Sequence, residues 1–280
     1  MKRLYIFLIA AMTVYLSACE KNTEGPEETI HSLKLVESYE GSNEHIEIYS
    51  QSKTLQVGYN KIWIKILDKA QENLVQVDQG FWRPVMHMPS MQHSSPHSSL
   101  VKSTDPDFTF EGYVVFTMAS DEKSYWELLV EYTYNQNSVT ETIGLKVNSL
   151  PKRHKNVQSF VYENEEYTIA LIDPKKPKMG SNIISAVLLK SSDHEKYEEV
   201  NGWEIDLDPR MPSMDNHDSP NNKNLIQKND KGEYIGTLNL SMSGYWRLNL
   251  KIIDSHKNVI KGEKVTKENE KSSVYFELEF

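Results

Sequence analysis

Methionine and histidine gather in one short segment of this chain, MHMPSMQHSSPH, which runs from Met86 to His97. A second segment, MPSMDNHDSP from Met211 to Pro220, repeats Met-Pro-Ser-Met and is again followed by a histidine and then Ser-Pro. Thioether sulfur and imidazole nitrogen are ligands that suit Cu(I) and, with more histidine, Cu(II). Calcium and magnesium prefer oxygen ligands, and zinc bound by the three histidines of the first segment would leave the methionines without a role. The two segments therefore predict copper binding.

Spacing limits which of these side chains can share an ion. In a straight strand, Met88 and Met91 would point to opposite faces about 10 Å apart. Pro89 has a fixed φ and no amide donor, so we expect a bend that brings the two sulfurs together. The predicted ligands are those that recur: Met88, Met91 and His93 in the first segment, and Met211, Met214 and His217 in the second. Weaker candidates are Met86, His87, His97, Met118 and Met242.

Packing is the alternative explanation for the methionines, because methionine is an adaptable filler of protein cores. Recurrence does not exclude this, since duplication copies structural motifs as well as ligands. Arg210 stands where the first segment has His87, and it adds a positive charge beside the second candidate site. Met118 and Met242 each precede a Tyr-Trp pair, and packing explains them more simply than metal binding does.

The two segments belong to a longer internal repeat with an offset of about 120 residues. A period of this length is typical of two tandem domains rather than of a solenoid, whose repeats are much shorter. The corresponding positions are Gly58 and Asn60 with Gly180 and Asn182, Met88 with Met211, Gly112 with Gly232, and Met118 and Trp126 with Met242 and Trp246.

Apolar and polar residues alternate with period two along several stretches, which is typical of strands with one buried face. These stretches are NKIWIKILD (60–68), YWELLVEYTY (125–134), YWRLNLKIID (245–254) and SVYFELEF (273–280). No stretch predicts a helix of ten residues or more. Short strands in units of 110 to 120 residues favour β-sandwiches. We therefore expect an all-β chain of two tandem immunoglobulin-like β-sandwich domains, residues 33–150 and 151–280, divided near Pro151.

The first residues are typical of a secretory signal, because Lys2 and Arg3 precede an apolar run, Leu4 to Leu16. This run is shorter than the roughly 20 residues of a membrane-spanning helix. The following LSAC resembles the bacterial lipobox, which implies cleavage before Cys19 and attachment of lipid, palmitate included, to its sulfur. Residues 1–18 would then be a lipoprotein signal peptide. Residues 19–32, polar and acidic after the cysteine, would be a flexible tether.

Composition excludes some classes of function. The formal net charge is −9, and removal of the leader takes away Lys2 and Arg3 and makes it −11. Nucleic-acid binding needs a basic surface, so we expect no nucleic-acid partner. Cys19 is the only cysteine, so a disulfide within the chain is excluded. The sequence has no nucleophile elbow, zinc-protease helix or phosphate-binding glycine loop, and we expect no enzyme activity.

The motifs together resemble a known family. MHMPSMQHSSP, then EGYVVFTMAS and YWELLVEY, is similar to the YtkA-like and FixH-like domains of the bacterial envelope. MPSMDNHDSP followed by GEYIGTLNLSMSGYWRLNL resembles the same family, and more closely its short form. The resemblance implies an immunoglobulin-like sandwich and a role in copper handling or copper-oxidase assembly. FixH proper has a transmembrane helix where this chain has a lipid anchor. Asp215-Asn216 also places one extra residue before the second histidine.

Two functions of different classes follow. The first is a lipid-anchored copper-binding protein of the bacterial cell envelope, at the outer membrane, which is attached through Cys19 and exchanges copper with oxidase-assembly or efflux proteins. The alternative is a non-catalytic structural or protein-binding lipoprotein, in which the methionines form a packed or partner-contacting loop.

Overall fold

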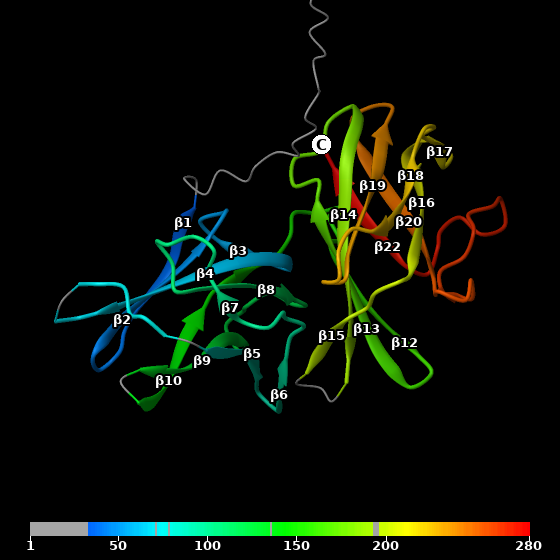
Figure 1. The fold of residues 1–280 in the computed structure, drawn as a ribbon. Helices are drawn as coiled ribbons and strands as arrows, with labels where there is room; N and C mark the ends of the chain where they lie inside the picture. The colour runs from blue at the N-terminus through cyan, green and yellow to red at the C-terminus, as the bar shows by residue number, and fades with distance from the viewer. Residues whose placement is uncertain (1–32, 71, 78, 135, 193–195) are drawn as a thin grey trace, which may run out of the picture. The chain divides into compact units, whose positions relative to one another are not determined.

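The computed structural model describes residues 33–70, 72–77, 79–134, 136–192 and 196–280. The predicted signal peptide, Cys19 and the tether lie outside these ranges. All elements named below belong to one compact unit, Ser32–Phe280. Within the described ranges the chain forms β-strands and one 3-10 turn, η2 (Pro212–Met214), and no α-helix (Figure 1). The all-β prediction is confirmed. In the same ranges, no helix is long and apolar enough to cross a membrane.

The strands fall into two groups along the chain. The first group comprises β1 (Lys34–Glu40), β2 (Glu44–Ser50), β3 (Leu55–Gln56), β4 (Gly58–Asp68), β5 (Gly80–Met88), β6 (Met91–Ser94), β7 (Val101–Lys102), β8 (Phe110–Phe116), β9 (Tyr125–Tyr134), β10 (Asn137–Leu145) and β11 (Val147–Asn148). The second group comprises β12 (Val157–Tyr162), β13 (Glu165–Asp173), β14 (Gly180–Ser191), β15 (Tyr197–Glu199), β16 (Glu204–Met211), β17 (His217–Asp218), β18 (Lys223–Gln227), β19 (Glu233–Leu240), β20 (Tyr245–Ile253), β21 (Val259–Lys261) and β22 (Tyr275–Glu279).

The first group forms two main sheets, with strand orders β1-β2-β4-β8-β7 and β10-β9-β5-β6. Alternate residues of each sheet are buried, as along β9, where Trp126, Leu128 and Val130 are fully enclosed. These side chains share one apolar core with Ile46 and Ile64 of the other sheet. Two sheets that bury their facing sides against each other form a sandwich-like arrangement.

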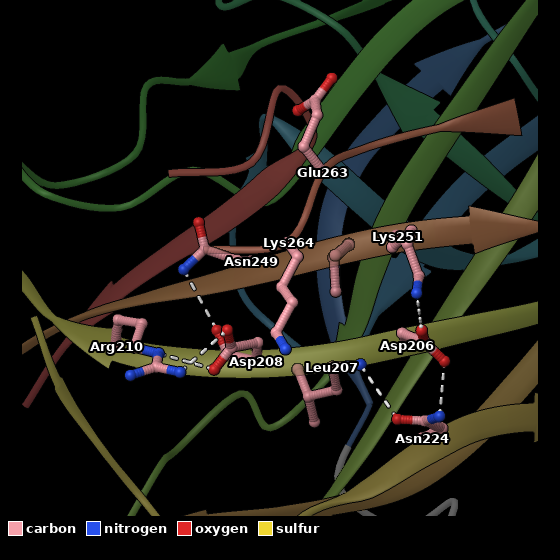
Figure 2. A pocket seen from close by; sticks show the side chains of 10 residues that line it. Asp206, Leu207, Asp208, Arg210, Asn224, Asn249, Lys251, Glu263 and Lys264 are labelled. Carbon is pink, nitrogen blue, oxygen red and sulfur yellow. Dashed lines mark hydrogen bonds and ion pairs between the residues drawn. The ribbon is translucent and has the colours of Figure 1, made fainter. Parts of the chain in front are cut away.

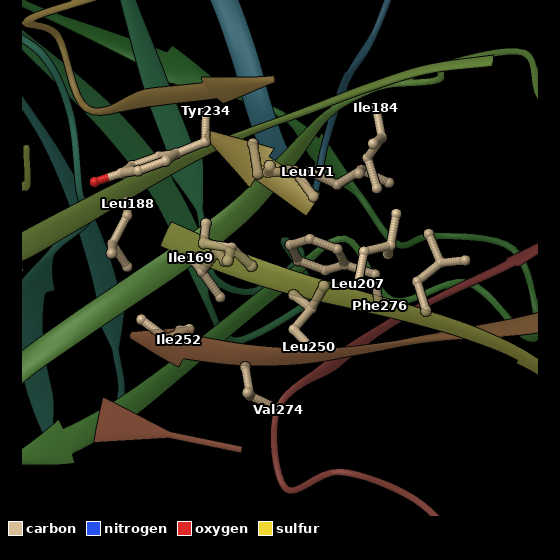
Figure 3. Close-up of a cluster of buried hydrophobic side chains, with 14 of the residues drawn as sticks. Ile169, Leu171, Ile184, Leu188, Leu207, Tyr234, Leu250, Ile252, Val274 and Phe276 are labelled. Carbon is tan, nitrogen blue, oxygen red and sulfur yellow. The ribbon is translucent and has the colours of Figure 1, made fainter. Parts of the chain in front are cut away.

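The second group repeats this pairing pattern but closes into a single sheet of 11 strands. Its path runs β12-β13-β14-β19-β18-β16-β20-β21, because β18 pairs with both β19 and β16. The sheet folds around one core of aliphatic and aromatic side chains (Figure 3). Trp246, Leu248 and Phe276 lie in this core, as the alternation in YWRLNLKIID and SVYFELEF predicts.

The same local hydrogen bonds begin β4 and β14. The amide nitrogen of Asn60 donates to the carbonyls of Gln56 and Gly58 at 2.7 and 2.8 Å. Asn182 donates in the same way to Lys178 and Gly180, at 2.7 and 3.0 Å. Gly58 and Gly180 both adopt positive φ, +102° and +84°, which glycine allows without strain.

Strand pairing corrects one correspondence drawn from the sequence. Gly112 pairs opposite Ile62 of β4, two residues beyond Asn60, and Gly236 pairs opposite Ile184, two residues beyond Asn182. Gly112 therefore corresponds to Gly236 and not to Gly232. Both glycines sit where a side chain would collide with close neighbours, which explains the residue type better than a turn does.

Candidate metal centre

The first Met/His segment forms a tight hairpin from β5 and β6. Pro89 and Ser90 make the turn, and Met88 pairs directly opposite Met91. Two residues further along, Met86 pairs opposite His93. Residues directly opposite each other in antiparallel strands point to the same face, with Cβ atoms about 4.5–5.5 Å apart. The turn at Pro89 thus places Met88 and Met91 opposite each other on one face of the hairpin.

Burial differs strongly among the four side chains on this face. Met86 is fully buried in the core, Met88 is half-buried and packs against that core, and Met91 is 56% exposed. His93 is half-buried, and its ring meets the Trp126 indole edge-on at a centroid distance of 5.7 Å. Met88, Met91 and His93 therefore lie at the edge of the core, where side chains are partly exposed to solvent. We call these three residues the rim, and Met86 lies beneath them in the core.

The hydrogen bond of His93 fixes which ring nitrogen is available. Its Nδ1 lies 2.8 Å from the Ser94 carbonyl oxygen, which can only accept. The neutral ring therefore donates from Nδ1 and keeps its lone pair on Nε2. Metal-bound histidines commonly hold the other ring N–H against a carbonyl in this way. Sequence reasoning did not foresee this contact, because it depends on the local conformation at Ser94.

His87 points to the opposite face of the hairpin. Its Nε2 lies 2.7 Å from the Glu127 carboxylate, and its Nδ1 lies 2.8 Å from the Gln92 amide nitrogen. The ring also stacks on Tyr125 at 4.8 Å and an interplanar angle of 6°. Both nitrogens are occupied by protein partners, so His87 does not converge with Met88 and Met91.

The remaining weaker candidates of the first half, His97 and Met118, are not part of the β5–β6 pairing. His97 is 8% exposed and its Nδ1 lies 2.7 Å from the Ser95 carbonyl oxygen. Burial lowers the pKa of His97, so the neutral form is favoured. Met118 contributes its carbonyl oxygen, which accepts a hydrogen bond of 3.0 Å from the Trp126 indole. Its side chain is 38% exposed.

The second Met/His segment is built differently. Met211, at the end of β16, pairs opposite His217 of β17, and five residues connect them. Met211 is 2% exposed and belongs to the core, whereas His217 is exposed. Met214 ends the η2 turn within the connection and is 50% exposed. The second half thus places one methionine opposite the histidine in the strand register and leaves Met214 outside the strand pairing.

Met242 repeats the structural role of Met118. Its carbonyl oxygen accepts a hydrogen bond of 3.0 Å from the Trp246 indole, and its partly buried side chain packs against the second core. In both halves the tryptophan is fully buried and satisfies its N–H with the methionine carbonyl. The contact uses the backbone carbonyl, which any residue supplies, so it does not by itself require a methionine side chain at either position.

A groove of about 450 Å³ lies on the outer face of β16 and β20 (Figure 2). Its two carboxylates on β16 already have cationic partners: Asp206 meets Lys251 at 2.6 Å, and Asp208 meets Arg210 at 2.7 Å. Asn224 adds a hydrogen bond of 2.6 Å to Asp206. Among the described residues, no three His, Cys, Asp or Glu side chains are placed to hold a metal ion. Methionine, whose thioether sulfur is the ligand predicted here, is not one of those four residue types.

Comparison with known families concerns the second half. Residues 162–251 match the YtkA-like family. This YtkA-like segment contains Met211, Met214, His217 and Trp246, and it covers about a third of the chain. The similarity expected from the MPSMDNHDSP and GYWRLNL motifs is therefore confirmed for residues 162–251. The FixH-like resemblance and a first copy of the family stay predictions.

Comparisons with curated proteins and with solved structures give less detail. No curated protein is significantly similar to it. Among 12 matching solved chains, one is FdeC, an Escherichia coli adhesin, at 14% identity over 77% of this chain and 62% of its own length, with a TM-score of 0.25. A conserved domain protein from Bacillus anthracis is 13% identical over 88% of this chain and 90% of its own, with a TM-score of 0.31. This chain thus spans less than two thirds of the adhesin chain.

Proposed function

We propose that the chain is a non-catalytic, lipid-anchored protein of the bacterial cell envelope that binds copper through Met88, Met91 and His93. The observation that carries this proposal is the β5–β6 pairing, which sets Met88 opposite Met91 and puts His93 on the same face. Two thioethers and one imidazole form a soft ligand set that suits Cu(I). The YtkA-like match lies in the second half, residues 162–251, and does not include these three residues. Support for copper comes instead from the resemblance of the first-half motifs to the same family, which implies copper handling or copper-oxidase assembly.

The geometry allows the ligands to converge. Cβ atoms of opposed residues lie about 5 Å apart, and each methionine sulfur is two bonds further out on a flexible chain. Two sulfurs at the roughly 2.3 Å typical of metal–sulfur bonds can therefore share one ion. Met91 is exposed, so its sulfur would be the first ligand to meet a copper ion from solvent. His93 Nε2 would be the third ligand. Such an open rim supports exchange of copper with a partner protein rather than permanent storage.

The second half offers a smaller set, Met211 and His217, because Met214 lies outside the strand pairing. We propose that copper binds there more weakly than in the first half. The shared asparagine and tryptophan hydrogen bonds support the further proposal that residues 33–150 and 151–280 are tandem copies of one domain. Attachment to the membrane through Cys19 belongs to the same proposal.

Anaerobic titration with Cu(I) against a chromophoric chelator tests the site. Met88→Leu and Met91→Leu keep side-chain volume but remove sulfur, and His93→Gln removes the imidazole. We expect each change to weaken copper binding at least tenfold, about 1.4 kcal/mol. Met179→Leu is the matched control, because Met179 is 63% exposed and lies outside both Met/His segments. Unchanged affinity in the three variants, or an equal loss in the control, would contradict the proposal.

The second candidate function is protein binding. Met91 and Met214 are 56% and 50% exposed, and exposed methionines adapt readily to a partner surface. Under this alternative, the leucine variants would retain partner binding and the titration would show no specific copper uptake. The same titration therefore separates the two functions.

A further inference from the structure

Positively charged side chains cluster around two tyrosines on the outer face of β20 and β22. Three cations surround the Tyr275 ring: the Lys155 ammonium at 3.9 Å from its centroid, the Arg247 guanidinium at 5.2 Å and the Lys271 ammonium at 5.4 Å. Arg153 lies over the neighbouring Tyr245 ring at 5.4 Å. We call these six residues the Tyr275 face: Arg153, Lys155, Tyr245, Arg247, Lys271 and Tyr275.

Separate segments hold this face together. Arg247 and Tyr275 belong to the paired strands β20 and β22, and Phe276, next to Tyr275, is buried in the core. Lys155 is fixed against β22 by two backbone hydrogen bonds with Glu277, of 2.9 and 3.0 Å. Lys271 comes from the connection before β22. The cluster is thus built by the fold and is not a run of neighbours in sequence.

Positive side chains outnumber negative side chains on the Tyr275 face. The acidic neighbours are Glu277 and Glu279, which pair with Arg247 at 3.4 Å and with Arg153 at 2.6 Å. Within the described residues, neither Lys155 nor Lys271 has a carboxylate partner. Burial, and then the positive charges of Lys271 and Arg247, lower the pKa of Lys155, although Glu277 opposes this. Like charges held this close destabilise one another until an anion joins them.

We propose that the Tyr275 face binds the phosphate groups of an anionic phospholipid surface. Lysine and arginine donate charge-assisted hydrogen bonds to phosphate, and tyrosine suits the interface between head groups and water. The occupant follows from the charge of the face and from the chain outside the structure. Residues 19–32 could extend at most about 50 Å, so a body anchored at Cys19 would stay within reach of lipid. The contact would orient an anchored body whose net charge is otherwise negative.

The test is sedimentation of the lipid-free chain, Glu20–Phe280, with vesicles of pure phosphatidylcholine or with 30% phosphatidylglycerol. The buried residues of the two large cores lie between Ile46 and Leu278, all within this chain. We expect binding to the anionic vesicles alone, and weaker binding in 0.5 M salt. The double variant Lys155→Gln/Lys271→Gln should bind about 30-fold more weakly, from about 1 kcal/mol for each basic residue near such a surface.

The control is Lys102→Gln/Lys223→Gln, which removes the same charge from exposed positions on β7 and β18. Equal losses in the two double variants would show a general charge effect and overturn the proposal, as would absence of binding to anionic vesicles. Displacement by 10 mM inorganic phosphate at constant ionic strength would assign the face to a soluble phosphate instead. Lys271→Gln alone changes an exposed residue, and a fivefold loss is expected even if Lys155→Gln disturbs folding. Copper titration of the same variants should be unchanged, so this result is independent of the copper site.

Discussion

Replacement of Asn60 or Asn182 by alanine tests whether the two halves share one structural device. Each side chain is more than nine-tenths buried and bonds to the backbone of the turn before its strand. Asn60 donates twice, to Gln56 and Gly58, and accepts from the Gln56 N–H at 3.1 Å. Each such hydrogen bond contributes about 0.5–1.5 kcal/mol net, so loss of three predicts about 2–4 kcal/mol.

Asn182 makes the equivalent three bonds, including one accepted from the Lys178 N–H at 3.0 Å. We therefore expect Asn60→Ala and Asn182→Ala to lower the free energy of unfolding by similar amounts. Urea unfolding followed by tryptophan fluorescence measures the loss. Asn43→Ala, at an exposed position, is the control and should change stability by less than about 0.5 kcal/mol.

Aspartate at the same positions makes the test sharper. In Asn60→Asp, one carboxylate oxygen can still accept from the Gln56 N–H. The other replaces the amide nitrogen and would face the carbonyl oxygens of Gln56 and Gly58, which it cannot bond when ionised. Asn60→Asp should therefore be at least as unstable as Asn60→Ala at neutral pH. A loss below about 0.5 kcal/mol in either alanine variant, or a large loss in one half alone, would refute the argument that these turns do the same work.

Two further changes probe the second half. Tyr234 is fully buried and donates to the Val200 carbonyl at 2.8 Å, and burial raises its pKa to about 12. Its contribution is complete below the unfolded pKa of about 10 and is lost as pH rises toward 12, so Tyr234→Phe should flatten the alkaline fall in stability, measured by urea unfolding from pH 9 to 12. Gly262 has φ +96°, and a Cβ there would lie 2.3 Å from the Leu250 carbonyl oxygen. Gly262→Ala should cost about 2 kcal/mol or more in urea unfolding, whereas Gly144→Ala, with open space around it, should cost little.

Strand alternation could be predicted because burial on one face leaves a direct mark on the sequence. Along β9 and β20, the residues expected inside, such as Trp126 and Trp246, are fully buried. By the same alternation, Asn249 falls on the polar side of β20, yet it is 2% exposed. Its side chain bonds to the Ser272 N–H at 2.9 Å and to the Asp208 carbonyl at 3.1 Å. A chain segment that returns over a strand leaves no periodic signal, so this burial was not predictable.

The order in which strands pair in the second sheet also could not be predicted from the sequence. The short strand β18 joins β19 to β16 and turns two layers into one continuous sheet, whereas β7 in the first half pairs with β8 only. Nothing in the β18 sequence KNLIQ indicates that it pairs with two strands, because pairing depends on which strands the fold brings next to it. The close approach is visible instead at Gly236, where a Cβ would lie 2.6 Å from the Lys223 carbonyl oxygen. A glycine inside a strand was the available signal.

Recurrence of Met-Pro-Ser-Met does not make the two hairpins equivalent, and a single extra residue accounts for much of the difference. In the first half, Pro89-Ser90 is the whole turn, so the two methionines become cross-strand partners. In the second, Pro212 begins a 3-10 turn and Asp215 and Asn216 follow with φ +54° and +53°. Short polar residues tolerate this left-handed conformation, and the chain uses both before it pairs again.

The longer connection moves the histidine and not only the methionine. His93 pairs opposite Met86, two residues before the turn methionine, whereas His217 pairs opposite Met211 itself. The first hairpin therefore places Met88, Met91 and His93 on one face, and the second places an exposed His217 opposite Met211, which the core encloses. Under the proposed function, the first hairpin offers the fuller ligand set, with two methionines and a histidine on one face. The second half, which carries the family match, offers only Met211 and His217 as strand-paired candidates.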